Sequence, residues 1–480
     1  MDWFGADGYE LARQVLQRGV AAIYLVAFLS TAAQFPALLG EHGLLPVPQF
    51  LRLSYAKKQP TLFRWRYSDR LLLTVAWVGA VVAASLVAGL PQLGPPWVPL
   101  ILFLAIWFGY LSIVNVGQTF YGFGWESLLL EAGFMVAFLG SNETAPPVLI
   151  IWLIRWLVFR LEFGAGMIKM RGDRSWRDLT ALYYHHETQP MPNPLSRFAH
   201  LMPKWFHRVE VLGNHFSQLI VPFFLFAPQP VASVAAAIVM LTQLWLVVTG
   251  NFAWLNVITI VLAFAALSDP AAHLVIPAMP AHTDYAFAVA PAWFIVIVIA
   301  ASLLVVILSW WPARNLVARR QLMNASFNRW HLVNAYGAFG SVTQVRYEIE
   351  IEGTDAPQPG PEAEWRAYEF KGKPGDPRRV PRQFAPYHLR LDWLMWFLAL
   401  GSPDNRWFIM LLGKLLETDP KTLKLLRVDP FHGEPPQWIR AKRYHYRFAT
   451  RAERRKRHVW WVREEAGMLV PPVSRDALRG

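Results

Sequence analysis

Nine apolar stretches in the first 311 residues constrain the fold of this chain more than any other feature. A helix needs about 20 predominantly apolar residues to cross a bilayer. The stretches lie at about 17–39, 71–91, 97–114, 125–140, 148–168, 209–227, 231–249, 251–268 and 287–311. Short links between some of them, such as residues 228–230, require antiparallel neighbours. The sequence therefore predicts a polytopic α-helical membrane bundle of about nine spans over residues 1–320.

Composition supports a membrane protein and limits its chemistry. Of the 480 residues, 54% are hydrophobic and 23 are Trp. The net charge of +13 is concentrated in two loops and the C-terminal third, which indicates contact with lipid headgroups, and no nucleic-acid-binding motif accompanies it. We expect membrane lipids as partners, no nucleic acid and no cofactor. The absence of cysteine excludes disulfides, thiolate metal sites and thiol redox catalysis by this chain.

Loop charge gives a topology prediction. Residues 40–70 and 169–208 are rich in Lys and Arg, whereas the links at 92–96, 141–147, 228–230 and 269–286 contain none. The positive-inside rule would place both basic loops and the C-terminus in the cytoplasm. The first apolar run has no small-residue cleavage site after it, so we interpret it as a retained span.

Residues 321–480 have a different pattern and predict an α+β domain. Residues 341–354, 365–373, 437–450 and 457–464 alternate apolar and polar side chains, as half-buried strands do. Residues 387–400 and 405–417 have the periodicity of amphipathic, Trp-rich helices. A domain of about 160 residues is long enough to bury its own core.

Three charges interrupt the fifth apolar stretch. Arg155, Glu162 and Lys169 are seven residues apart, which places them on one face of a helix. Such a face in a membrane protein turns towards protein or water. One interpretation is a structural ladder of ion pairs, with Lys169 extending to the interface. The other is that burial makes Lys169 a catalytic base.

The polar loop at 169–208 follows this helix. His185, His186 and Glu187 are possible metal ligands, but adjacent side chains point in different directions and the HExxH spacing of a zinc helix is absent. Nearby prolines favour a rigid, extended segment. We therefore expect no metal, and a recognition or packing loop that includes Trp176, Arg177, His185, His186, Glu187, Gln189 and Asn193.

A polar stripe follows on the next predicted helix, made by His207, Glu210, Asn214 and Gln218 at spacings of three and four. Hydrogen bonds that join helices are one explanation. The functional alternative is that the stripe faces the helix of Arg155 and Lys169 across a polar cavity. In that case Glu126 and Glu131, on the preceding short span, neutralise the arginines.

Several long motifs resemble the lipase maturation factors. The segments FGWESLLLEAGF (123–134), RWLVFRLEFGAGMIKMRGDRSWRDLTAL with HHETQPMPNP (155–194) and HRVEVLGNHFSQLIVPFFLF (207–226) carry the resemblance, and 334–354, 368–397 and 438–448 resemble that family's C-terminal domain. The resemblance implies a non-enzymatic membrane factor that helps lipase-like secreted proteins fold and assemble. It implies the endoplasmic reticulum membrane, or the cytoplasmic membrane in a prokaryote. It also places the C-terminal domain in the lumen, against the positive-inside count.

A weaker resemblance concerns FGAGMIKM followed by Trp176, which is similar to the membrane domain of vitamin K-dependent γ-carboxylases. There a lysine at the matching place is a catalytic base, so the resemblance carries over only to Lys169. It implies a second hypothesis, a membrane enzyme acting on a lipid-like or quinone-like substrate. A transporter is disfavoured because neither inverted repeats nor a pair of broken helices is visible.

Overall fold

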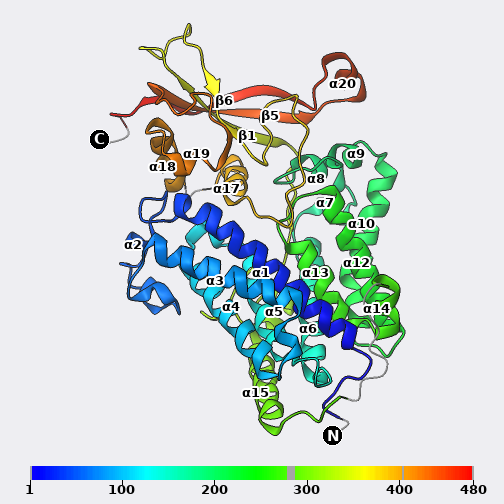
Figure 1. The fold of residues 1–480 in the computed structure, drawn as a ribbon. Helices are drawn as coiled ribbons and strands as arrows, with labels where there is room; N and C mark the ends of the chain where they lie inside the picture. Colours follow the sequence, from blue (N-terminus) through cyan, green and yellow to red (C-terminus); the bar gives the residue numbers. More distant parts are fainter. Residues whose placement is uncertain (1–2, 278–286, 403–404, 478–480) are drawn as a thin grey trace.

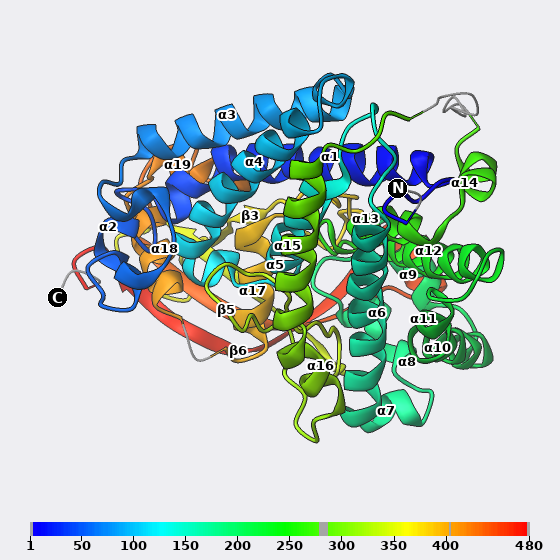
Figure 2. The same cartoon turned by 90° about the horizontal axis from the view of Figure 1, so that it is seen from below.

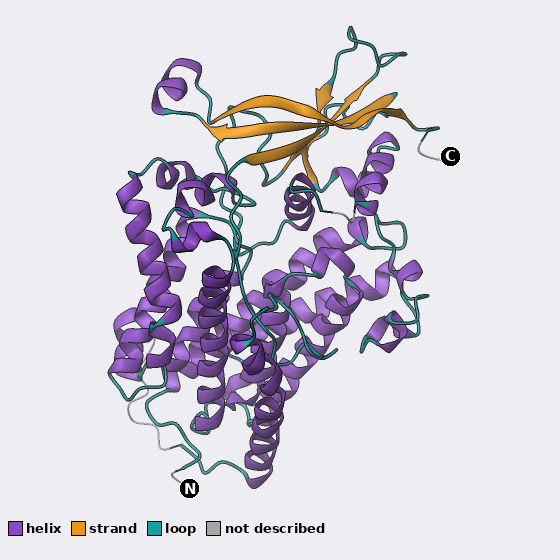
Figure 3. Ribbon diagram, turned by 180° about the vertical axis from the view of Figure 1, so that it is seen from behind, coloured by secondary structure: helices purple, strands orange, loops and turns teal. Residues whose placement is uncertain are grey.

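A helical bundle forms one end of the molecule and a β-sheet crosses the other, with short helices between them (Figure 1). The computed structural model describes residues 3–277, 287–402 and 405–477. Figure 3 shows the strands gathered on one side of the helices. Each of the nine predicted apolar stretches contains a helix. The chain is therefore a membrane helical bundle followed by a region that contains β-sheet.

Five helices are long and apolar enough to cross a membrane: α1 (Glu10–Leu38), α3 (Asp69–Ala88), α4 (Trp97–Val116), α12 (Val231–Thr249) and the helix over Ala292–Val317. The last is divided into α15 (Ala292–Leu308) and α16 (Trp310–Val317). Helix α1 packs along α3, where Gly79 lies directly against the ring of Phe28; a Cβ at Gly79 would lie 2.5 Å from that ring. The two backbones can approach this closely because Gly79 has no side chain.

The other four predicted spans are also helical, but the count of nine is not confirmed. They are α5 (Gly124–Val136), α6 (Val148–Arg171), α10 (Lys204–Leu219) and α13 (Leu255–Ala263). Helix α13 is far shorter than a bilayer, at about 1.5 Å per residue. Helix α6 has 24 residues but carries buried charges. The number of spans beyond five stays a prediction.

Short helices connect these elements (Figure 2). In chain order they are α2 (Val47–Phe50), α7 (Arg174–Arg177), α8 (Leu182–Thr188), α9 (Ser196–His200), α11 (Val221–Phe224) and α14 (Asp269–Val275). Helices α7 to α9 belong to the 169–208 loop, which is therefore folded into helical turns rather than extended as predicted.

The C-terminal region contains a four-stranded antiparallel sheet in the order β2-β1-β5-β6. Its strands are β2 (Arg366–Ala367), β1 (Arg346–Thr354), β5 (Trp438–Phe448) and β6 (Trp461–Ser474), and a separate pair joins β3 (Glu369–Phe370) to β4 (Leu426–Val428). Helices α17 (Arg390–Ala399), α18 (Arg406–Leu416), α19 (Pro420–Leu423) and α20 (Arg451–Arg457) complete it. This confirms β-sheet in this region.

Two details of the strand prediction were wrong. The predicted strand at 365–373 is divided between two sheets, as β2 and β3. The last strand begins at Trp461, because residues 451–457 form α20, which Thr450 and Glu453 cap reciprocally. A capping box stabilises the first turn of a helix and so ends the preceding strand. Strand β6 then extends ten residues beyond the predicted end at 464.

Buried polar contacts join the C-terminal region to the bundle. Arg390 at the start of α17 donates to Glu126 on α5 over 2.5 Å. Asn334 and Tyr336 both donate to Glu131, also on α5. The division into residues 1–320 and 321–480 stays a prediction, because these contacts cross it.

Candidate functional site

A cavity of about 660 Å³ opens between the membrane helices and the segments that cross their ends. Helices α6, α10, α12 and α13, residues 336–341 and helix α17 all contribute to its walls. Aromatic and aliphatic side chains make up most of the lining. The charged and amide side chains among them are Glu162, Lys169, Glu210, Asn214, Gln218, Gln243, Asn256 and Asn324. An apolar cavity of this size with a few converging polar groups is typical of a small-molecule site.

Lys169 lies buried at one wall of this cavity, near the end of α6. Its Nζ donates to Asn214 Oδ1 and Gln218 Oε1, both over 2.8 Å. Nζ also lies 4.7 Å from the centre of the Trp176 ring. Amide oxygens accept hydrogen bonds, and an aromatic face attracts a cation. All three contacts therefore stabilise the charged ammonium form of Lys169.

Glu162 lies two turns earlier on α6 and ends a chain of amide side chains. Gln243 Nε2 donates to Glu162 Oε1 over 2.6 Å, and Asn256 Nδ2 donates to Gln243 Oε1 over 2.6 Å. The second carboxylate oxygen of Glu162 is buried without a hydrogen-bond partner among the described residues. The amide of Gln243 on α12 thus contacts this carboxylate, and Asn256 on α13 holds Gln243 in place.

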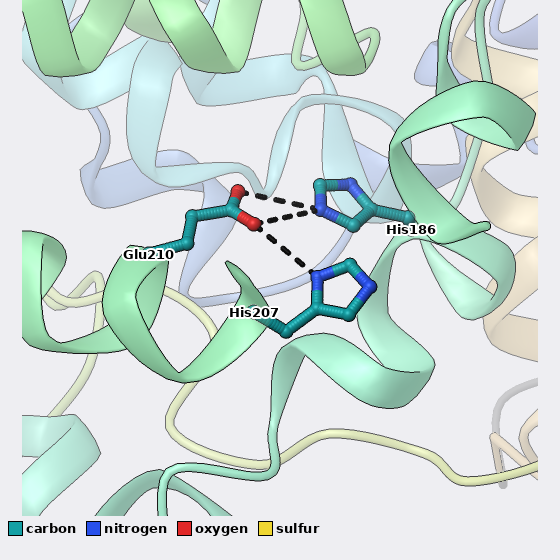
Figure 4. A group of neighbouring side chains, drawn as sticks. All are labelled: His186, His207 and Glu210. Carbon is teal, nitrogen blue, oxygen red and sulfur yellow. Dashed lines mark hydrogen bonds and ion pairs between the residues drawn. The ribbon is translucent and has the colours of Figure 1, made fainter. Parts of the chain in front are cut away.

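His186, His207 and Glu210 form a cluster beside the same cavity (Figure 4). His186 Nε2 lies 3.3 Å from Glu210 Oε1, and His207 Nδ1 lies 3.4 Å from Glu210 Oε2. Trp245 on α12 donates to Glu210 Oε1 over 2.5 Å. His186 comes from α8 and the other two from α10, so the fold combines the loop with the polar stripe.

The remaining histidines of the loop are held neutral. His185 is buried between the rings of Phe252 and Phe339. Burial, together with the neighbouring His186, lowers the pKa of His185 to about 3. Burial also lowers the pKa of His200 to about 4. Both rings are therefore uncharged at neutral pH.

Other predicted loop residues serve packing. Trp176 is buried and its Nε1 donates to the Phe339 carbonyl over 2.8 Å. Gln189 Nε2 donates to the carbonyls of His186 and Thr249. Asn193 Oδ1 accepts from the Ser196 amide over 2.9 Å. Arg177 is exposed and donates to the Met170 carbonyl over 3.1 Å.

Glu187 ties the loop to the sheet. Its Oε2 accepts from the Phe448 amide at the end of β5 over 2.8 Å. Arg346, at the start of β1, donates to the carbonyls of Glu187, Gln189 and Pro190. These contacts join the end of β5 and the start of β1 to the turn that follows α8.

Arg155 does not face the polar stripe, which corrects the prediction for that residue. It donates to the carbonyls of Ala265 and Leu225 and, over 2.7 Å, to the Tyr9 hydroxyl. The seven-residue spacing drifts about 20° per heptad on a straight helix. Arg155 is also three to four turns from Lys169, so it meets different neighbours.

Glu126 and Glu131 each pair with an arginine, as expected from the sequence, but neither pairs with Arg155 among the described residues. Glu131 pairs with Arg160 on α6, and both side chains are buried. Glu126 pairs with Arg390 from the C-terminal region. The cation that neutralises Glu126 is thus more than 260 positions away along the chain, which local spacing does not reveal.

Some residues of the site were missed. Gln243 is an isolated amide within an apolar run, and that isolation is a usable signal. Phe339 and its neighbours at 336–341 line the cavity from a segment without regular structure. No sequence pattern marks that segment as part of the site.

Comparison with known proteins supports the resemblance seen in the motifs. The family models described as lipase maturation factor transmembrane domain and lipase maturation factor C-terminal domain match residues 11–274 and 332–471. Lipase maturation factor 1 of Bos taurus is 41% identical, over 99% of this chain and 91% of the relative. The Homo sapiens protein of that name is 40% identical, over 98% and 89%. Lipase maturation factor 2 of Homo sapiens is 28% identical, over 97% and 83%. No solved structure matches the chain.

Proposed function

Because the chain belongs to the lipase maturation factor family, we propose that it assists the folding and assembly of a secreted lipase-like client. In a eukaryote this takes place at the endoplasmic reticulum membrane, and in a prokaryote at the cytoplasmic membrane. The client contacts the surface made by the 169–208 loop and the C-terminal sheet. The cavity among the helices is then a structural or lipid-binding feature.

This proposal rests on the contacts that join the 169–208 loop to the C-terminal sheet. Besides the contacts of Arg346 and Glu187, Arg197 on α9 donates to the Ala449 carbonyl over 2.8 Å. Phe198 packs against Trp460, with ring centres 6.0 Å apart. Two segments far apart in the sequence thus form one surface at the end of the bundle, which suits the recognition of a folding chain.

Strand β6 offers the most accessible part of this surface. It lies at the edge of the sheet, and seven consecutive residues, 463–469, are exposed. Because neighbouring strand residues point to opposite faces, both faces of β6 are open there. An unpaired edge can add a strand from another chain through main-chain hydrogen bonds. The charges of Arg463, Glu464 and Glu465 protect the edge from self-association.

The test is a pair of surface substitutions on β6. Met468→Asp and Leu469→Asp replace side chains that are 47% and 43% exposed, so the fold loses little buried apolar area. Each variant is expressed with a lipase in cells that lack maturation factors, and the specific activity of secreted lipase is measured. We expect both to reduce it. Val380→Asp, at a position 47% exposed and outside β6, is the matched control.

Full lipase activity with both β6 variants would refute binding at this strand. Deletion of residues 321–480 is a poor test, because it would leave Glu126 and Glu131 buried without Arg390, Asn334 and Tyr336. The resulting loss of stability would imitate a loss of client binding.

The cavity supports a second candidate, an enzyme acting on a lipid-like or quinone-like molecule with Lys169 as base. A base needs a free lone pair, whereas Lys169 Nζ meets two amide oxygens and an aromatic face. We therefore favour the maturation factor. Lys169→Ala, compared with the wild type at equal amounts of folded protein, separates the two, because an enzyme then loses all function. A maturation factor keeps its function in proportion to the folded protein.

A further inference from the structure

Three potential metal ligands converge at the wall of the cavity, although they come from separate segments of the chain. One nitrogen each from His186 and His207 and a carboxylate oxygen of Glu210 all lie within 4.8 Å of one another. Both histidines are 2% exposed, and the Glu210 side chain is 13% exposed. Figure 4 shows the three side chains pointing towards one another. Such burial distinguishes this cluster from acidic groups on a surface.

The surroundings of His207 determine which of its nitrogens carries hydrogen. His207 Nε2 lies 3.3 Å from the His200 carbonyl oxygen, which can only accept. Nε2 is therefore the donor, and in a neutral ring the lone pair of Nδ1 faces Glu210 Oε2 at 3.4 Å. A lone pair facing a carboxylate oxygen is unfavourable, so either a proton or a metal ion lies between the two atoms. A metal-binding histidine characteristically donates its other N–H to a carbonyl in this way.

The distances also fit a metal better than direct hydrogen bonds. The single carboxylate oxygen Oε2 of Glu210 lies 3.5 Å from His186 Nε2 and 3.4 Å from His207 Nδ1. A charged N–H···O bond is shorter, at about 2.7–2.9 Å. Zinc binds His nitrogen and carboxylate oxygen at about 2.0–2.2 Å, so two ligands of a tetrahedral ion are separated by about 3.3–3.5 Å.

The cluster also contains an outer partner for its carboxylate. Trp245 Nε1 donates to Glu210 Oε1 over 2.5 Å, which holds the side chain in place. Ligating carboxylates are usually hydrogen-bonded in this manner. His186 and Glu210 line the cavity, so a fourth coordination position would open into it.

We propose that His186, His207 and Glu210 bind one divalent transition-metal ion, with zinc as the favoured chemistry. Two imidazoles and one carboxylate form a borderline donor set suited to zinc and cobalt rather than calcium or magnesium. Three protein ligands leave the fourth position for water or a ligand oxygen in the cavity. This site does not depend on the proposed role with a client.

The proposal is tested by metal binding to the full chain, purified in detergent through a tag without histidine. Zinc is titrated into protein stripped with chelator, and bound metal is counted by mass spectrometry after gel filtration. Cobalt(II), whose visible absorption reports tetrahedral coordination, replaces zinc in a parallel titration. The variants are His186→Ala, Glu210→Gln and, as matched control, His215→Ala. His215 lies on α10 as well, but its Nε2 contacts the Trp176 carbonyl over 3.0 Å instead.

We expect one zinc ion per chain in the wild type and in His215→Ala, with tetrahedral cobalt absorption. His186→Ala and Glu210→Gln should each weaken binding more than about tenfold, since loss of even an outer partner of a metal ligand weakens binding by 10–100-fold. The melting temperature without metal shows whether each variant is folded. Absence of a stoichiometric site in the wild type, or equal binding by folded Glu210→Gln, would overturn the proposal.

Discussion

Replacing Arg390 with Met will destabilise the protein strongly, because it leaves Glu126 buried without its cation. Both side chains are fully buried, and Arg390 Nη1 lies 2.5 Å from Glu126 Oε1. Nη1 also donates to the Phe120 carbonyl over 2.9 Å. Removing one partner of a buried pair costs about 3–5 kcal/mol. The Tyr110 hydroxyl still donates to Glu126, which favours the lower end of that range.

The assay is thermal unfolding in detergent, followed by tryptophan fluorescence at one scan rate for all variants. At about 2 °C per kcal/mol, the expected decrease in melting temperature is about 6–10 °C. The matched control is Arg174→Met, which breaks an ion pair with Asp178 in which Arg174 is 82% exposed. An exposed pair of this kind contributes about 0.2–1 kcal/mol, so the control should melt within about 2 °C of the wild type.

A double variant tests the physical reason. Glu126→Gln combined with Arg390→Met removes the charge that the single variant leaves unpaired. It should therefore be more stable than the sum of the two single effects predicts, by at least about 1 kcal/mol. If Arg390→Met melts like the wild type, or the two effects simply add, the buried pair does not hold the C-terminal region to the bundle.

Three further predictions are tested by the same melting assay or by limited proteolysis. Burial and Arg390 lower the pKa of His388 to about 4 from an unfolded value near 6.5, so the ring is neutral when folded. The free energy of unfolding is therefore highest above pH 6.5 and decreases by about 3 kcal/mol as the pH falls towards 4. His388→Gln should make the melting temperature depend less on pH over this range. Lys169→Met should cost about 1–3 kcal/mol, since it leaves the amide oxygens of Asn214 and Gln218 without their donor; an unchanged melting temperature would contradict those contacts. Arg346→Met should release the 169–208 loop and speed its limited proteolysis, because it removes three hydrogen bonds to that loop. Cleavage within the membrane helices should not change.

Local patterns predicted the parts of the structure that depend on short-range physics. Apolar length predicted the helices of the bundle, and strict alternation predicted β1 and β5. The stripe of His207, Glu210 and Asn214 was predicted from spacing alone, since residues three and four apart share one helix face. The absence of cysteine also excluded thiol chemistry without any reference to the fold.

Pairing between distant segments required the tertiary structure. Neither the Arg390 partner of Glu126 nor the approach of His186 to His207 and Glu210 follows from spacing, because each depends on how separate helices are packed. The three charges of α6 show both contributions: their shared helix was evident from the sequence, but Arg155 meets backbone carbonyls, Glu162 meets Gln243 and Lys169 meets the stripe on α10. Helical periodicity determines which way a side chain points, and only packing decides what it contacts.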